Sequence, residues 1–248
     1  MHPKIKDFFE DCDAEIKGMG EDHDVQGLSR IWLREITRHK YAYHFTWLGR
    51  PAIQFPQDMI ATQELIWQIK PDLIIETGVA HGGSILFYAS LLELIHPQQP
   101  AYVLGIDIDI REHNRAEIEN HPYFHRVRLL EGSSVSPEII QEAQKHAADK
   151  KKIMVILDSN HTHEHVLKEL EAYGPLVSHG SYCVVMDTVI ELMPTEFFAN
   201  SSWGIGNNPK TAVTEYLKHN PHFSVDESID HKLLISAAPG GYLKCQKP

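Results

Sequence analysis

Two carboxylates and one imidazole stand where the chain could assemble a metal-assisted site. Asp158 ends the apolar run 152–158, and Asp187 ends the apolar run 182–187. Because parallel strands present their carboxyl ends to one crevice, we expect these side chains to meet there. Carboxylate oxygens suit Mg²⁺, Ca²⁺ or Mn²⁺, and a separation within about 6 Å would let both reach one ion. The alternative is that each aspartate only caps the turn after its strand.

Three histidines follow the first aspartate, at positions 161, 163 and 165. Imidazole titrates near neutrality, so His161 is predicted to act as a general base that takes the proton from a substrate hydroxyl. Two other interpretations stay open. His161 and His165 could share one helix face without a chemical role, or the trio could bind a transition metal. The order H-T-H-E-H does not match the zinc motif H-E-x-x-H.

A glycine-bearing turn follows another apolar run. Residues 73–75 stop at Glu76, Gly78 opens the turn, and a helical pattern begins near Ser84. A strand, a glycine turn and a helix together present backbone N–H groups to a nucleotide-like ligand. The spacing is not G-x-G-x-x-G. An acidic residue two positions before the first glycine resembles the pattern of S-adenosylmethionine-dependent methyltransferases, and an ordinary turn with a satisfied glutamate is the alternative.

Two further strand ends carry polar side chains. Asp107 ends the run 102–107, 31 residues after Glu76, which is about one strand–helix–strand unit further along. A carboxylate at this position holds ribose hydroxyls in dinucleotide-binding folds. The third run, 127–130, leads to Ser133 and Ser134, whose hydroxyls could line an adenine pocket or cap the following helix.

The elements that must position these residues alternate between strand and helix from about residue 72 to 190. This alternation predicts an α/β fold with a parallel sheet covered by helices on both faces. A helix is expected to open at Pro56, another to span 212–219, and the last strands to lie at 223–225 and 233–236. Residues 1–40 show a modest helical pattern that three glycines interrupt, and residues 41–56 are rich in aromatic side chains and turns.

Composition narrows the classes of function. The chain has 248 residues and a net charge of −11, which argues against binding the nucleic-acid phosphate backbone. Its three cysteines are far apart in sequence and predict a reducing compartment without a disulfide framework. No apolar run reaches the length of about 18 residues that a membrane span needs, and no secretory leader is recognised. We therefore expect a soluble, cytoplasmic protein that binds neither membrane nor nucleic acid.

Longer motifs resemble the cephalosporin hydroxylase / rhamnosyl O-methyltransferase family over roughly residues 40–245. They comprise Trp47-Leu-Gly49, Pro51, Gln54-Phe-Pro56 and the segments 71–78, 81–84, 105–111, 157–159, 163–166, 203–212 and 241–244. The resemblance implies a Rossmann-like class I methyltransferase with a seven-stranded, mostly parallel sheet. Its active-site layout is similar to that of catechol O-methyltransferase, which uses a divalent metal.

The resemblance also implies a role for each candidate residue. It implies that S-adenosylmethionine binds to Glu76, Gly78, His81 and Ser84, with its ribose on Asp107 and its adenine near Ser133 or Ser134. It implies Mg²⁺ on Asp158 and Asp187, with Asp158 also bordering the cofactor. It places His161 where the catechol enzyme carries its catalytic lysine. Family members often carry Glu-Asp at the end of the fifth strand, whereas Met186 precedes Asp187 here. Thr188, Glu191 or a water could take the place of the missing carboxylate.

We therefore predict an S-adenosylmethionine-dependent O-methyltransferase, assisted by a divalent metal, that acts on a hydroxyl of a sugar or natural-product scaffold. Residues 1–56 are expected to form a helical and aromatic extension and lid, and residues 57–248 the cofactor-binding domain. The loop 203–209 is a second candidate lid, and a homo-oligomer is possible. The alternatives are a cofactor-binding partner subunit without chemistry, for which Met186 is the best argument, and an oxidation enzyme that uses iron or NAD(P).

Overall fold

A seven-stranded sheet forms the centre of the computed structural model, which describes residues 2–247. Its strands, in spatial order, are β5 (Val127–Glu131), β4 (Tyr102–Asp107), β3 (Leu73–Thr77), β6 (Ile153–Leu157), β7 (Tyr182–Val185), β9 (Tyr242–Cys245) and β8 (Phe223–Val225). Neighbouring strands run parallel from β5 to β7, and β9 is antiparallel to both of its neighbours. The predicted mostly parallel α/β sheet is confirmed.

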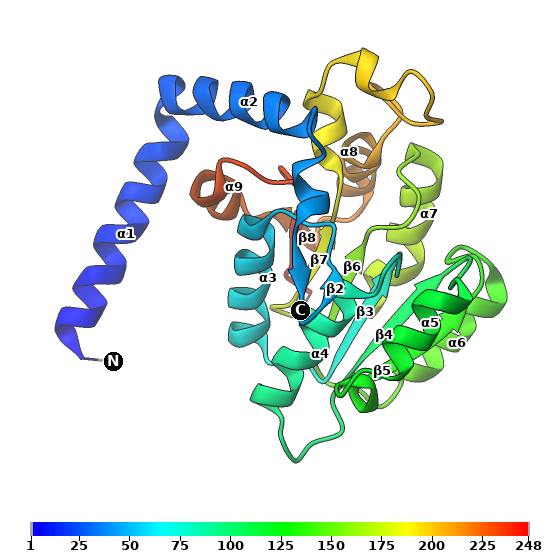
Figure 1. The fold of residues 1–248 in the computed structure, drawn as a ribbon. Coiled ribbons are helices and arrows are strands. Elements are labelled where there is room, and N and C mark those ends of the chain that lie inside the picture. Colours follow the sequence, from blue (N-terminus) through cyan, green and yellow to red (C-terminus); the bar gives the residue numbers. More distant parts are fainter. Residues whose placement is uncertain (1, 248) are drawn as a thin grey trace.

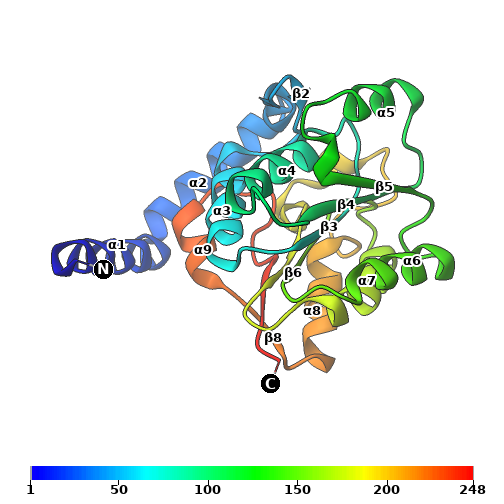
Figure 2. The ribbon, with the colours of Figure 1, turned by 90° about the horizontal axis from the view of Figure 1, so that it is seen from below.

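Helices cover both faces of this sheet (Figure 2). One face carries α3 (Pro56–Ile69), α4 (Gly83–Ile95) and α5 (Glu112–Glu119), and the other carries α6 (Pro137–Ala147), α7 (His163–Tyr173) and α8 (Pro209–His219). Side chains of β3 alternate between the two cores, with Ile74 on the α4 side and Leu73 and Ile75 on the α7 side. Burial on both faces explains why this strand reads as an unbroken apolar run.

The described residues also form short 3₁₀ turns and a two-stranded hairpin. The 3₁₀ turns are η1 (Tyr41–His44), η2 (Phe124–Arg126), η3 (Gly174–Leu176), η4 (Thr188–Leu192) and η5 (Thr195–Phe198), and a two-stranded hairpin joins β1 (Thr46–Trp47) to β2 (Arg50–Pro51). Among the described residues, no helix combines the length and apolarity needed to cross a membrane.

The helices α1 (Pro3–Glu21) and α2 (His23–Thr37) form an arm that projects from the sheet domain (Figure 1). The expectation that glycines interrupt this region was wrong. Gly18 and Gly27 sit in the helices with open space around them, and Gly20 lets α1 approach the His231 ring on α9 (Glu227–Leu233) closely. No residue of α1 is buried, and Phe8 and Phe9 are 61% and 51% exposed.

The predicted strand at 233–236 was also wrong. Leu233 ends α9, and Leu234 adopts a positive φ of 58° that breaks any strand. Ser236 Oγ and the Ala237 N–H then donate to the buried Asp58 carboxylate at 2.6 and 2.7 Å, which holds this segment across α3 instead of in the sheet. The last strand is β9, which begins at Tyr242.

The β1–β2 hairpin is fixed directly to α4. An added Cβ on Gly83 would lie 2.2 Å from the Pro51 carbonyl oxygen, so the two backbones touch. The Trp47 indole packs edge-on against Phe87 at 4.8 Å and donates to Ser90 Oγ at 3.1 Å. This part of the N-terminal region therefore belongs to the sheet domain's core.

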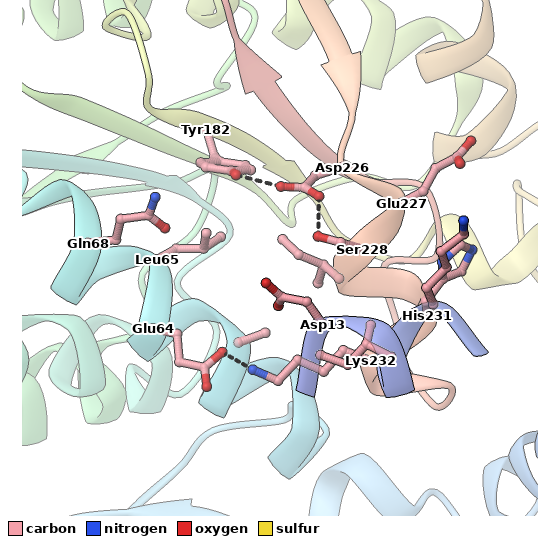
Figure 3. A pocket seen from close by; sticks show the side chains of 14 residues that line it. Asp13, Glu64, Leu65, Gln68, Tyr182, Asp226, Glu227, Ser228, His231 and Lys232 are labelled. Atoms are coloured by element: carbon pink, nitrogen blue, oxygen red, sulfur yellow. Dashed lines mark hydrogen bonds and ion pairs between the residues drawn. The ribbon is translucent and has the colours of Figure 1, made fainter. Parts of the chain in front are cut away.

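A cavity of about 580 Å³ lies at the seam between α1, α3 and α9 (Figure 3). Polar side chains surround it and pair with one another. Tyr182 donates to Asp226 at 2.6 Å, Ser228 donates to the same carboxylate, and Lys232 pairs with Glu64. None of the predicted site residues lines this seam, so it is separate from the predicted chemistry.

Candidate functional site

The carboxyl ends of β3, β4 and β6 enclose a cavity of about 370 Å³. Its lining includes Gly78, Asp107, Ser133, Ser134 and Asp158, all of them predicted site residues, together with Ala80, Ile106, Ile108, Ser159, Asn160 and His165. The structure thus brings residues from four separate motifs to one crevice, because the ends of adjacent parallel strands meet on the same edge of the sheet.

The glycine turn is held open by Asp107. Its carboxylate oxygen Oδ2 accepts the backbone N–H groups of Val79 at 2.8 Å and Ala80 at 3.1 Å. Gly78 has a φ of +92°, and an added Cβ would lie 2.0 Å from the Asp158 carbonyl oxygen. Only glycine fits this close approach. Asp107 therefore shapes the turn as well as lining the cavity, a function that the sequence did not reveal.

Glu76 lies beneath the turn and is completely buried. Ser84 donates to its Oε2 at 2.9 Å, while Oε1 has no hydrogen-bond partner among the described residues. Burial raises the pKa of this carboxyl from 4.5 to about 8, against the opposing effect of the Ser84 hydrogen bond. The buried carboxyl thus has one oxygen, Oε1, that could face a positively charged group of a ligand.

Three predicted cofactor residues, Glu76, His81 and Ser84, do not line the cavity, and His81 makes contacts beside the turn. Its Nδ1 lies 3.3 Å from Asn114 Oδ1, and its carbonyl oxygen accepts from Arg50 Nε at 3.0 Å. These contacts tie the glycine turn to α5 and to the β1–β2 hairpin. The structure therefore places His81 beside the turn, where it supports the backbone.

The serine side of the cavity contains a histidine that the sequence analysis did not select. The N-cap of α6 is Ser136, whose side chain accepts from the Ile139 N–H. Ser133 and Ser134 therefore do not cap this helix. Ser134 Oγ lies 3.0 Å from His165 Nε2. Ser133, Ser134 and His165 together line this side of the cavity.

A buried glutamate stands behind this histidine. Ser159 Oγ donates to Glu169 Oε1 at 2.7 Å, and His165 Nε2 lies 3.5 Å from the same oxygen. Glu169 is 0% exposed, and its Oε2 has no partner among the described residues. The signal that could have found this pair is its spacing of four residues on α7.

The candidate metal residues lie beside the cavity. Asp158, His161 and Asp187 each offer one ligand atom, and these atoms lie within 4.8 Å of one another. His161 Nε2 is 3.3 Å from Asp187 Oδ2. Asp187 adopts a left-handed backbone, with φ of +56°, directly after β7. The two aspartates therefore point to one place, as the strand order predicts.

Charge repulsion is built into this arrangement. Loss of hydration, and then the like charge of Asp187, raise the pKa of the Asp158 carboxyl well above its usual range. A cation placed between the two carboxylates would relieve that repulsion. The two carboxylates thus form a donor pair that fits a divalent metal, and the His161 imidazole lies beside them.

The other histidines and the suggested substitute ligands face elsewhere. His163 Nδ1 lies 2.8 Å from Thr211 Oγ1 on α8, so the three histidines do not converge. Glu191 accepts from the Gly206 N–H at 2.9 Å and holds the loop 203–209. Thr188 is buried and donates to the Pro239 carbonyl oxygen at 3.0 Å. Neither residue replaces the missing carboxylate, so Asp158 and Asp187 are the two carboxylates of this cluster.

The strand order, the glycine turn and the carboxylates at the strand ends define a Rossmann-like class I methyltransferase fold. The family model "Rhamnosyl O-methyltransferase/CmcI" matches residues 39–246, so the match begins after α2. The chain belongs to this family. The predicted family is thereby confirmed.

Curated relatives agree with this assignment. The chain is 32% identical over 205 residues to a protein named rhamnosyl O-methyltransferase from Mycobacterium tuberculosis (strain ATCC 25618 / H37Rv), covering 80% of this chain and 77% of that protein. It is 30% identical over 200 residues to the protein of the same name from Mycobacterium leprae (strain TN), covering 80% and 82%.

A solved structure shares the fold. The structure described as "cmcI-D160 Mg-SAM" superposes with a TM-score of 0.56 at 18% identity, covering 83% of this chain and 78% of that one. At this identity the likeness shows the fold alone.

Proposed function

We propose that this protein is an S-adenosylmethionine-dependent O-methyltransferase, assisted by a divalent metal, that acts on a hydroxyl of a small molecule. The observation that carries the proposal is the convergence of Asp158, His161 and Asp187 beside the cavity under the glycine turn. The curated relatives, which are named rhamnosyl O-methyltransferases, support it and make a deoxyhexose the first acceptor to test.

The residues around the cavity fit the proposed methyl donor. The unpartnered Glu76 Oε1 would face its positive charge, Gly78 would let the backbone approach it, and Asp107 would hold its ribose. Ser133 and Ser134 would border its adenine. Bound S-adenosylmethionine would supply an activated methyl group, and the enzyme's contribution is then orientation and exclusion of water.

The donor set fits the proposed metal. Asp158 and Asp187 would hold Mg²⁺, which when bound would supply a positive charge that lowers the pKa of the acceptor hydroxyl and fixes its direction. Met186 is buried and contributes no ligand atom, so we expect weaker metal binding than with a Glu-Asp pair.

His161 is proposed as the general base. The Asp187 carboxylate 3.3 Å from Nε2 stabilises the imidazolium that forms when the base takes a proton. The edge-to-face contact of the His161 ring with Trp203, at 4.9 Å, holds the imidazole in place from the opposite loop. The loop 203–209, anchored through Glu191, would close the site from water.

The rival functions are less well supported. An iron-dependent oxidation enzyme requires histidines that converge, whereas His161, His163 and His165 contact different partners. A partner subunit without chemistry would not need the donor set to be kept together beside the cavity.

The test is transfer of a radiolabelled methyl group from S-adenosylmethionine to a panel of deoxyhexosides and phenols, with Mg²⁺ and with a chelator. We expect transfer that depends on the metal and that Asp158→Asn abolishes. Asp149→Asn, a change at a carboxylate that is 78% exposed and outside the site, is the matched control. Binding of the cofactor without transfer to any acceptor would favour the partner subunit.

Three coarser properties complete the proposal. The N-terminal region 1–56 would act as a lid, since its aromatic residues lie close to Asp187. A second copy of the chain would cover the exposed side chains of Phe8, Phe9 and Trp32 on the arm, because a 19-residue helix without a buried residue gains little from its own domain. The three free cysteines suit a reducing cytoplasm.

A further inference from the structure

A third cavity, of about 510 Å³, opens on the other side of the candidate metal residues. Its lining comes from the end of α2, η1, the start of α3 and the turns η4 and η5, and includes Asp187 and Val189. Because Asp187 belongs both to this lining and to the donor set, a molecule in this cavity can place a hydroxyl beside the proposed metal and base.

Five aromatic residues line this cavity, namely Tyr41, Tyr43, Phe55, Phe197 and Phe198. Tyr41 stacks on the buried Phe55 at 5.9 Å with 30° between the ring planes, and Phe45 meets Tyr41 edge-on at 4.9 Å. Phe197 and Phe198 line the wall formed by η5. Flat, partly buried rings of this kind bind planar or ring-shaped apolar groups by area burial and stacking.

Two cations border the same cavity. The Arg38 guanidinium lies over the Phe197 ring at 5.7 Å, and the Lys40 ammonium lies over the Tyr43 ring at 5.8 Å. Glu35 lies 3.5 Å from Arg38, and Asp187 is the single acidic residue among the described lining residues. The lining thus offers two cations and one acidic residue, with Glu35 beside Arg38.

We propose that this cavity binds the acceptor, and that the acceptor is a hydroxylated molecule with a flat apolar portion and an anionic group. The hydroxyl lies at Asp187, the apolar portion lies against Tyr41 and Phe197, and the anion lies at Arg38 and Lys40. This inference rests on the proposed function, since it assigns the second substrate of the same site.

The test compares two probes that differ in one charge, 3,4-dihydroxybenzoate and 3,4-dihydroxybenzyl alcohol. Each is titrated calorimetrically into the full chain with Mg²⁺ and S-adenosylhomocysteine present, so that no reaction occurs. We expect the benzoate to bind about fivefold or more tightly than the alcohol, which is the effect of pairing one anion with partly exposed cations.

Variants assign this difference to residues. Arg38→Gln combined with Lys40→Asn should remove the preference for the benzoate, and asparagine tolerates the positive φ of 50° at position 40. Phe197→Ala should weaken both probes about tenfold or more through loss of the ring. Arg34→Gln is the matched control, because Arg34 also pairs with Glu35 but does not line the cavity.

The outcomes separate this inference from the function on which it rests. Equal affinities for the two probes, equal effects of Arg34→Gln and of the combined Arg38→Gln and Lys40→Asn variant, or no binding of either probe to chain that has S-adenosylhomocysteine bound would each overturn the acceptor assignment. Failure to bind S-adenosylhomocysteine at all would overturn the proposed function instead. A thermal unfolding midpoint within a few degrees of the unmodified chain shows that each variant is folded.

Discussion

Replacing Glu76 with glutamine should stabilise the cofactor-free protein at alkaline pH and destabilise it at acidic pH. The side chain is fully buried, Ser84 donates to one of its oxygens, and the other has no partner among the described residues. Burial raises the pKa of this carboxyl to about 8. Glu76→Gln keeps the shape and an acceptor for Ser84 but removes the ionisation.

The direction in which the free energy of unfolding changes with pH follows from proton binding. Between pH 4.5 and about 8 the folded chain holds a proton on Glu76 that the unfolded chain has released, so the free energy of unfolding falls as the pH rises. At about 1.4 kcal/mol per pH unit, this interval corresponds to about 5 kcal/mol, fully lost above pH 8. An amide N–H without a partner in the glutamine variant costs about 1–3 kcal/mol at every pH. The variant should therefore be more stable than the unmodified chain by about 2 kcal/mol or more at pH 8.5 and less stable at pH 5.

Urea unfolding without cofactor, at pH values between 5 and 8.5, measures the pH at which the unfolding free energies of the two proteins become equal. Burial also raises the pKa of Asp58, to about 6, and this contribution has the same sign in both proteins and cancels in their difference. Glu15→Gln, an exposed position on α1, is the control and should run parallel to the unmodified chain. Parallel curves for Glu76→Gln as well would refute the reasoning, because they would mean that Glu76 is ionised in the folded state.

Three further predictions concern the site. Asp107→Asn should keep the turn, since its amide oxygen can accept the Val79 N–H, yet weaken S-adenosylhomocysteine binding about tenfold by calorimetry; unchanged affinity would contradict the ribose assignment. Asp187→Asn should raise the Mg²⁺ concentration at half-maximal rate about tenfold or more; an unmoved metal titration would show that the ion binds elsewhere. His161→Ala should slow methyl transfer about 10²–10⁴-fold with cofactor affinity kept, while His163→Ala changes it little; equal losses at both positions would revive the oxidation alternative.

The sequence predicts those parts of the fold that are determined by residues close together in the chain. Every residue of β3 and β6 is buried, so each strand appears as an apolar run that stops where a polar residue reaches the sheet's edge. That stop is also where the chemistry lies, because Glu76 and Asp158 stand at the ends of these two strands. A pattern read along the chain therefore locates the candidate site as well as the sheet.

The parts that it does not predict have causes far away in sequence. Residues 233–236 have strand-like composition, but Asp58, 178 positions before Ser236, captures them through hydrogen bonds. Tyr242 donates to the same carboxylate at 2.7 Å and starts β9 there. No local window contains this information, since a short apolar run fits a strand and a buried loop equally well.

The choice among the three histidines depends on the rotation of one helix. Asn160 Oδ1 accepts from the Thr162 N–H, and α7 begins at the next residue. With that start, the helical rotation turns His163 towards α8 and His165 towards the cavity. A start shifted by one residue would rotate both side chains by about 100° away from these partners, and sequence reasoning rarely fixes a helix terminus that closely.

The backbone contact between Gly83 and Pro51 limits how the family can exchange acceptors by recombination. The hairpin rests on the first turn of the helix that follows the glycine turn, without a side chain between them. A graft of residues 37–44 from a relative would replace Tyr41, Tyr43 and both cations and leave this backbone contact intact. A graft that extends to residue 56 would also replace the β1–β2 hairpin. It would fold only if the grafted hairpin fits the same close backbone contact with Gly83. The part of the proposed acceptor wall before Thr46 can therefore be exchanged separately, whereas the hairpin after it rests on the helix that follows the glycine turn.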